Sequence, residues 1–234
     1  MRQIANIAVK EFNDYFTSPI AYIVISIFLV VTGWFFFSTF FLFDRADMRN
    51  FFSLLPIIFS FIIPAITMRL FSEEINVGSY EILVTMPVSF VDIALGKFVA
   101  ALFFTACMLI PTISYPVFIS LIGEIDLGPV IGGYIGAFFL GGAYCALGVF
   151  SSCLTRNQII AFIVGVAICF TLTIIDKILF FMPKSIVSFV GFLGAGGHFQ
   201  SISKGVIDSR DIIYFLSIIF LGLLGTYLVM CKKN

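Results

Sequence analysis

Side chains that could perform catalysis or bind a metal are scarce in this sequence. Its 234 residues include one histidine, His198, and five cysteines with long spacings and no C-x-x-C pair. A lone histidine does not make a metal site, and cysteines inside apolar segments are usually small packing residues. The nucleotide-binding motif Gly-x-x-x-x-Gly-Lys-Ser/Thr does not occur. We therefore expect a protein that is not an enzyme and carries no metal or cofactor of its own.

Charged side chains gather in one segment, residues 69–97. It contains six of the 26 charged residues: Arg69, Glu73, Glu74, Glu81, Asp92 and Lys97. We expect residues 68–77 to extend the preceding helix, Gly78 and Ser79 to break it, and residues 80–85 to form a short second helix that ends at Pro87. Such an elbow is either an ordinary loop or a docking surface for a soluble partner.

The composition explains why charge is so rare. Apolar residues make up 61% of the chain and charged residues 11%, with a mean hydropathy of +1.15. Soluble domains have about 25% charged residues, so a soluble enzyme and a disordered scaffold are excluded. The net charge is zero, which leaves no basic surface for nucleic acid. The sequence predicts a polytopic protein embedded in a lipid bilayer.

Six uncharged stretches are long enough to cross the bilayer, which takes about 20 apolar residues. They are residues 15–43, 50–68, 98–123, 127–155, 157–175 and 212–231. Residues 185–203 are also uncharged, but their second half is rich in glycine and polar residues, a pattern tolerated at membrane depth only when buried or facing water. We expect an all-α fold with six transmembrane helices and a re-entrant helical hairpin within 177–211. Seven spans is the alternative.

The first 18 residues predict an amphipathic helix that lies in the membrane interface. Its apolar face contains Ile4, Ile7, Ala8, Phe12, Tyr15 and Phe16, and Lys10 lies on the opposite face. Ser18 can cap the next helix and Pro19 suits its first turn. Glu11 falls within the apolar face. It either reaches the headgroup level or pairs with a cation of segment 69–97.

Glycines recur every four residues in the fourth span, at Gly128, Gly132 and Gly136, with Gly133 and Gly141 in a parallel row. Small residues at this spacing let helices approach closely. These glycines either allow helices of one subunit to pack closely or take part in a gate or a dimer interface. Asp176 is the deepest carboxylate and lies at the end of a span, so no ionisable group is expected at mid-membrane. This argues against an ion-coupled secondary transporter, which stays an alternative.

Several motifs resemble a known family. Phe71-x-x-Glu74-x-x-x-Gly78-x-Tyr80, with Glu81-Ile82-Leu83 and Thr85-Met86-Pro87, resembles the cytoplasmic segment of ABC-2-type transporter permeases. Lys10-Glu11-Phe12, followed by residues 15–19, resembles their N-terminal elbow helix. Residues 131–136 and 151–159, and residues 198–199 with 204–208, are similar to the gliding-motility-associated permease subunit. The resemblance covers nearly the whole chain.

The resemblance implies one permease domain over residues 1–234, with both termini in the bacterial cytoplasm. A count of seven cytoplasmic against six outer cations barely decides the orientation, although Lys232 and Lys233 favour the same side. The chain would pair with a second permease chain, as a homodimer or pseudo-dimer, and with two copies of an ABC ATPase that holds ATP and Mg. An auxiliary membrane-anchored extracytoplasmic subunit often accompanies such permeases. The cargo is unidentified and export is the expected direction; a non-transporting assembly or scaffold protein is a further alternative.

The resemblance also implies roles for particular residues. Glu73 and Glu74 would pair with cations of the ATPase, and Tyr80 would be a buried anchor. The outer hairpin would form an extracytoplasmic gate with Gly194, Gly196, Gly197 and His198. The interfacial elbow would use Lys10, Glu11, Phe12 and Pro19. The ATPase-coupling residues would be Phe71, Ser72, Glu73, Glu74, Gly78, Ser79, Tyr80, Glu81, Leu83, Thr85 and Pro87.

Overall fold

The computed structural model describes residues 2–43, 47–79, 88–123, 125–178, 191–206 and 208–233, without the side chains of Arg2 and of residues 39–43. Every element in these residues is helical. Six helices in this part of the chain are long and apolar enough to cross a bilayer. The predicted all-α fold with six helices of membrane-spanning length and hydropathy is therefore confirmed for the described residues.

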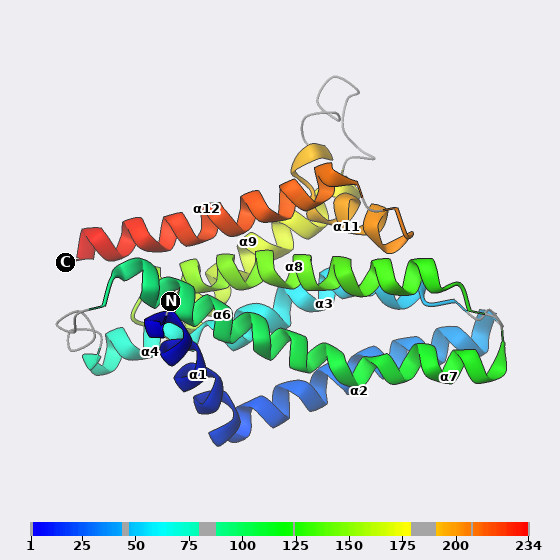
Figure 1. Cartoon of the computed structure of the whole chain (residues 1–234), viewed down its shortest axis with the longest axis horizontal. Helices are drawn as coiled ribbons and strands as arrows, with labels where there is room; N and C mark the ends of the chain where they lie inside the picture. Colours follow the sequence, from blue (N-terminus) through cyan, green and yellow to red (C-terminus); the bar gives the residue numbers. More distant parts are fainter. Residues whose placement is uncertain are drawn as a thin grey trace.

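The six long helices run alternately up and down one bundle (Figure 1). The spans are α2, then α3 continued by α4, then α6 continued by η1 and α7, then α8, α9 and α12. Both chain ends lie at the end of the bundle where α4 is found, and α7 lies at the opposite end. The bounds are α2 Pro19–Phe43, α3 Arg49–Thr67, α4 Arg69–Val77, α6 Phe90–Leu109, η1 Ile110–Ile113, α7 Ser114–Ile122, α8 Leu127–Leu154, α9 Gln158–Ile178 and α12 Ser209–Lys233.

The third span begins earlier than the uncharged stretch from residue 98 suggests. Helix α6 starts at Phe90 because Ser89 caps it: the Ser89 hydroxyl accepts a hydrogen bond from the Asp92 amide at 3.1 Å and donates one to the Asp92 carboxylate at 2.7 Å. Lys97 consequently lies two turns inside a helix instead of in a loop. Its ammonium group is surrounded by protein.

Helix α8 is the centre of the bundle and contacts α3, α4, α6, α9, α11 and α12. It is the most buried of the six spans, whereas α2 and α9 expose most of their surface. The core around it consists of aliphatic and aromatic side chains from α3, α6 and α12, with Phe52, Phe59 and Phe104 among the fully buried rings. The outer helices present apolar side chains outward, as expected for a surface that faces lipid.

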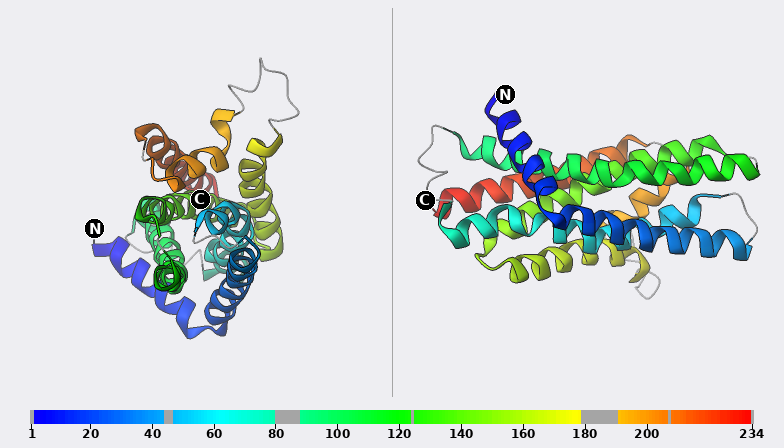
Figure 2. Two further views of the ribbon diagram at one scale, coloured as in Figure 1. Left: turned by 90° about the vertical axis from the view of Figure 1, so that its right-hand side faces the viewer. Right: turned by 90° about the horizontal axis from the view of Figure 1, so that it is seen from below.

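The predicted N-terminal helix is present as α1, Arg2–Thr17. It crosses the side of the bundle obliquely, from α6 to the start of α2 (Figure 2). Part of its apolar face packs on α6: Ile7 occupies the space beside Gly96, and the Tyr15 ring lies 4.9 Å from the Phe104 ring. Helix α2 begins at Pro19 as predicted, and the Ser18 hydroxyl accepts a long hydrogen bond, 3.4 Å, from the Ile20 amide.

The glycine-rich stretch after α9 contains a short helix, α11, Ala195–Ser203. Nine residues of helix extend about 14 Å, which is too short to cross a bilayer. Helix α11 contacts α3, α8, α9 and α12 and lies alongside α8, short of the far ends of α7 and α8 (Figure 1). Residues 179–190, the first half of the predicted hairpin, lie outside the described residues.

Candidate functional site

Helix α4 projects from the end of α3 and stops at a glycine. Met68 keeps helical geometry and donates its amide hydrogen to Pro64 O at 2.9 Å, so α3 and α4 are nearly continuous. The helix ends at Gly78, where φ is +82°, a conformation in which glycine is strongly preferred. Val77, Gly78 and Ser79 are exposed. The predicted helix extension and its break are both observed.

A buried ammonium group connects α4 to α1 and α6. Lys97 Nζ of α6 lies 2.9 Å from Glu11 Oε1 of α1 and 2.8 Å from Glu74 Oε1 of α4. It also donates a hydrogen bond to Leu70 O at 2.7 Å and lies 5.1 Å from the centre of the Phe71 ring. We call these five residues the Lys97 cluster. It joins three elements that are far apart in the sequence.

The ammonium group of the Lys97 cluster is fully paired within the chain, but the cluster as a whole carries a net negative charge. The Lys97 side chain is 1% exposed, and those of Glu11 and Glu74 are 12% and 17% exposed. An ammonium group so deeply buried is tolerated only when ionic and hydrogen-bonding partners replace its water. Two carboxylates share this one cation, which leaves one negative charge in excess. Lys10, whose Nζ lies 4.0 Å from Glu11 Oε1, offsets it only weakly because Lys10 is largely exposed.

The cluster decides between the two expectations for Glu11. Its carboxylate pairs with Lys97, a cation of segment 69–97, instead of reaching outward. From the sequence, Lys97 was expected at the end of the polar segment 69–97. Its position inside α6, between Glu11 and Glu74, was not predicted. The capping pair Ser89-x-x-Asp92 is the signal that could have placed Lys97 inside a helix.

The two carboxylates expected to face a partner differ from each other. Glu73 makes a two-point pair with Arg69 one turn earlier, at 2.8 and 3.2 Å, on a half-exposed face. Glu74 points inward to Lys97. In this structure Lys97 of the same chain supplies the opposite charge for Glu74. Contact of Glu74 with a separate subunit stays a prediction.

The other residues of the predicted coupling segment are divided between core and surface. Phe71 is fully buried, and Ser72 is buried with its hydroxyl bonded to Met68 O. Ser79 is exposed. The remaining ones lie outside the described residues: Tyr80, Glu81, Leu83, Thr85 and Pro87.

At the opposite end of the bundle, a carboxylate of α9 caps α11. Asp176 Oδ2 accepts a hydrogen bond from the Gly197 amide at 2.7 Å, in the first turn of α11. A Cβ at Gly194 would overlap the carboxylate, and one at Gly196 would lie 2.6 Å from Oδ2. These glycines therefore allow the helix start to approach Asp176, an arrangement in which a carboxylate meets the positive end of a helix dipole.

His198 belongs to a polar contact between α11 and α12. Its Nδ1 lies 2.6 Å from Asp211 Oδ1, its Nε2 lies 3.1 Å from Phe192 O, and its ring stacks on Tyr214 with 4.1 Å between centres. Tyr214 in turn donates a hydrogen bond to Leu193 O at 2.6 Å. Sequence reasoning did not single out Asp211, which gave no signal beyond its place in the first turn of α12.

The glycines of α8 lie against different neighbours. Gly132 and Gly136 face α11, where Ile202 O and the Phe199 ring occupy the space a Cβ would need. Gly133 faces the Phe52 ring of α3, and Gly141 faces Thr105 of α6, 2.9 Å from the position of an added Cβ. Gly128, in the first turn, meets only its own cap residue, Asp126. All of these contacts lie within one chain.

Comparison with known proteins adds no family assignment. No protein-family model matches the sequence, and no match to it was found among curated proteins. Among the described residues, no three histidine, cysteine, aspartate or glutamate side chains are close enough together to hold a metal ion. The functional reading therefore depends on the helical bundle, the Lys97 cluster and the sequence motifs.

Proposed function

We propose that this chain is the permease subunit of an ATP-driven ABC-2-type transporter. A separate ATPase, present in two copies with ATP and Mg, would drive movement of a cargo, with export as the direction, across the bacterial cytoplasmic membrane. The motifs of residues 10–19 and 71–87 support the family, and six membrane-length helices support a permease. Both termini and α4 would then face the cytoplasm.

The single observation that carries the proposal is the Lys97 cluster. Helix α4 continues α3, and Lys97 fastens it to α1 and α6. A force on the exposed end of α4 would therefore move the interfacial helix and two spans as one unit. This is the mechanical property required of an element that converts closure of an ATPase into tilting of transmembrane helices.

The proposal gives the coupling residues two kinds of role. Glu74, Phe71 and Ser72 would transmit movement inside the chain. Contact with the ATPase would fall to the exposed tip, where Val77 is 73% exposed although it is apolar. An exposed aliphatic side chain beside a helix end is suited to a pocket on a partner.

The far end would serve as the extracytoplasmic gate. Helix α11 is short, is flanked by α8, α9 and α12, and is anchored by Asp176 and Asp211. These features support a re-entrant hairpin that dips between the spans. A second permease chain and an auxiliary extracytoplasmic subunit would complete the complex.

Co-purification with a matched pair of variants tests the proposal. The C-terminally tagged chain is expressed in its own host and extracted in mild detergent, with and without crosslinking. We expect an ATPase in stoichiometric amount, reduced about tenfold by Val77→Asp, a loss typical of one anchor residue. Val206→Asp is the control, because Val206 is 65% exposed outside the α4 end.

Two outcomes would contradict the proposal. A chain that purifies without any ATPase, even after crosslinking, would return the ion-coupled secondary transporter to first place. A bound ATPase whose activity drives no transport in sealed vesicles would indicate a membrane assembly or scaffold protein.

A further inference from the structure

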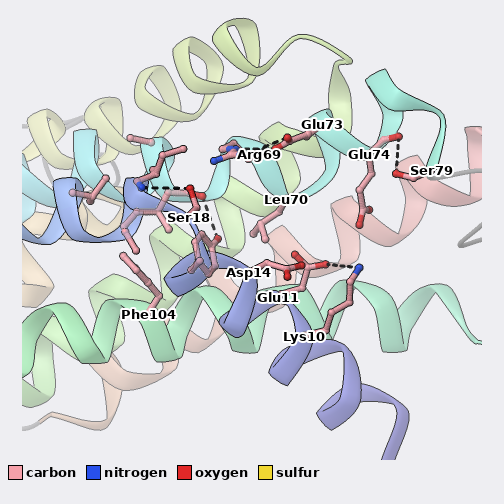
Figure 3. Close-up of a pocket in the computed structure, with 16 residues that line it drawn as sticks. Lys10, Glu11, Asp14, Ser18, Arg69, Leu70, Glu73, Glu74, Ser79 and Phe104 are labelled. Carbon is pink, nitrogen blue, oxygen red and sulfur yellow. Dashed lines mark hydrogen bonds and ion pairs between the residues drawn. The ribbon is translucent and has the colours of Figure 1, made fainter.

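A cavity of about 300 Å³ lies where α1 meets the start of α2 and the junction of α3 with α4 (Figure 3). One part of its wall is charged and the other is apolar. The charged part contains Lys10, Glu11, Asp14, Arg69, Glu73 and Glu74, and the apolar part contains Ile20, Ala21, Val24, Ala65, Ile66 and Phe104. The two parts call for a ligand with a polar head and an apolar tail.

The charged part carries more negative than positive charge. Of its six ionisable groups, four are carboxylates and two are cations; Lys97, which pairs with Glu11 and Glu74 from behind, raises the cations to three. Arg69 is already committed to Glu73 through two hydrogen bonds. One negative charge is left uncompensated in a partly desolvated place, where charge interactions are stronger than in water.

Two acceptors at this wall are not fully used. The Asp14 carboxylate is exposed and has no ion pair or side-chain hydrogen bond within the described part of the chain. Glu74 Oε2 is buried and lacks a hydrogen-bond partner among the described residues, since Lys97 binds Oε1. A buried carboxylate oxygen without a hydrogen bond is costly, which applies to Glu74 Oε2 and not to the exposed Asp14. A cation at this wall would offset the excess negative charge and pair with Asp14.

Other polar groups at the cavity are already occupied. The Tyr15 hydroxyl donates a hydrogen bond to Ile66 O at 3.2 Å. Burial raises the pKa of Tyr15 well above its usual value, with the Glu11 carboxylate among the lesser causes, so the hydroxyl stays protonated. Tyr15 therefore adds no charge to the wall.

The apolar part lies at the level where the chain enters the bundle. Ile20 and Val24 belong to the first turns of α2, the first span, and Ile20 is 38% exposed at the cavity. An aliphatic chain that leaves the cavity along α2 would enter the surrounding bilayer. The charged part then lies at the headgroup level, next to the interfacial helix.

We propose that this cavity binds the headgroup of a phospholipid with a primary ammonium, phosphatidylethanolamine, from the bilayer leaflet in which α1 lies. The ammonium would pair with the exposed Asp14 and be attracted by the excess negative charge of Glu11 and Glu74 behind it. The phosphate would lie near the exposed Lys10, and an acyl chain would follow Ile20 and Val24. Phosphatidylcholine carries a cation without N–H donors, and phosphatidylglycerol carries no cation. The structure thus predicts a preference among headgroups.

Lipid binding is measured on the purified full-length chain after delipidation. Mixed micelles contain phosphatidylethanolamine, phosphatidylcholine or phosphatidylglycerol with identical oleoyl chains, and bound lipid is counted by native mass spectrometry. We expect the ethanolamine lipid to bind best and the glycerol lipid worst. Asp14→Asn should weaken ethanolamine binding by roughly fivefold, the size of one partly exposed ion pair, and Asp208→Asn outside the cavity should leave it unchanged.

A second pair of variants separates the cavity from general charge effects. Val24→Phe fills the apolar part and should reduce retention of the ethanolamine lipid. Val30→Phe is the control, since Val30 lies on the same helix, is 70% exposed and is not part of the cavity wall. Equal binding of the three lipids, or unchanged retention in Val24→Phe, would overturn the proposal. Neither result depends on an ATPase, so the proposed transporter function is tested separately.

Discussion

At the residue scale, Lys97 holds three helices together through one ammonium group. Its partners Glu11 and Glu74 are both largely buried. Among the described residues Glu74 has no second cation, and Glu11 has only the largely exposed Lys10 at 4.0 Å. Removing one partner of a buried pair leaves an uncompensated charge, which is more damaging than removing the whole network. A single neutral variant therefore measures the cost of an unpaired buried charge, whereas the combined variant measures the net contribution of the whole network to stability.

Lys97→Met should destabilise the protein by about 3–5 kcal/mol, because two buried carboxylates lose their cation. The triple variant Lys97→Met, Glu11→Gln, Glu74→Gln should recover most of this loss. Buried Cys145, Cys153 and Cys169 report unfolding through a thiol-reactive dye during heating in detergent. A triple variant no more stable than Lys97→Met alone would show that the charges do not act as one cluster.

The sequence revealed part of this cluster and hid the rest. Glu11 stood out because a carboxylate interrupts an apolar face, and this is visible from helical periodicity alone. Its partner is 86 residues away along the chain, and only the packing of α1 on α6 brings the two together. The inward turn of Glu74, next to the outward Glu73, likewise depends on the direction in which α4 leaves α3.

At the element scale, α8 and α11 pack closely because glycines at their contact have no side chains. Gly132 and Gly136 of α8 leave room for the backbone and side chains of α11, and Gly194 and Gly196 leave room for Asp176. The sequence indicated close helix contacts from the four-residue spacing of glycines. Which helix each row faces could not be predicted, because the position of α11 is determined by Asp176 and α12 as well as by α8.

Gly132→Ala should lower stability by about 1–3 kcal/mol, because its Cβ would collide with the backbone of Ile202 and lie 3.1 Å from Gly205 Cα. Gly128→Ala is the matched control: its Cβ would meet only Asp126 Oδ1, at an ordinary 3.4 Å. The thiol-reactive dye assay compares the two. Equal melting temperatures of Gly132→Ala and Gly128→Ala would contradict the observed packing of α11 on α8.

At the scale of the whole molecule, six alternating spans bring both termini to the same end as α4. The number of spans follows from hydropathy, because 20 apolar residues without charge have few alternatives to crossing a bilayer. The orientation does not follow, since the cations are almost equally divided. Hydropathy could not predict the early start of α6, because a capping residue determines it. Nor could it predict the position of α11, because close contacts at glycines determine that position.

We expect both ends and the α4 segment to face the cytoplasm. Alkaline phosphatase, which is active only outside the cytoplasm, should be inactive when fused after residue 233 and active when fused after Gly123. Green fluorescent protein should show the reverse pattern. Activity of both phosphatase fusions would contradict the three spans between Gly123 and residue 233. Activity of the C-terminal fusion alone would reverse the orientation.

The order in which the Lys97 cluster emerges from the ribosome has a consequence for biogenesis. Glu11 and Glu74 are synthesised before Lys97, so the first two spans enter the membrane with two carboxylates that await their counter-ion. The contacts among α1, α4 and α6 cannot form until α6 has been synthesised and inserted. In a chain that folds during synthesis, a contact forms only after its last residue has been made. A nascent chain halted before residue 97 would therefore present unpaired acidic groups, a feature by which membrane quality control could distinguish it from the finished protein.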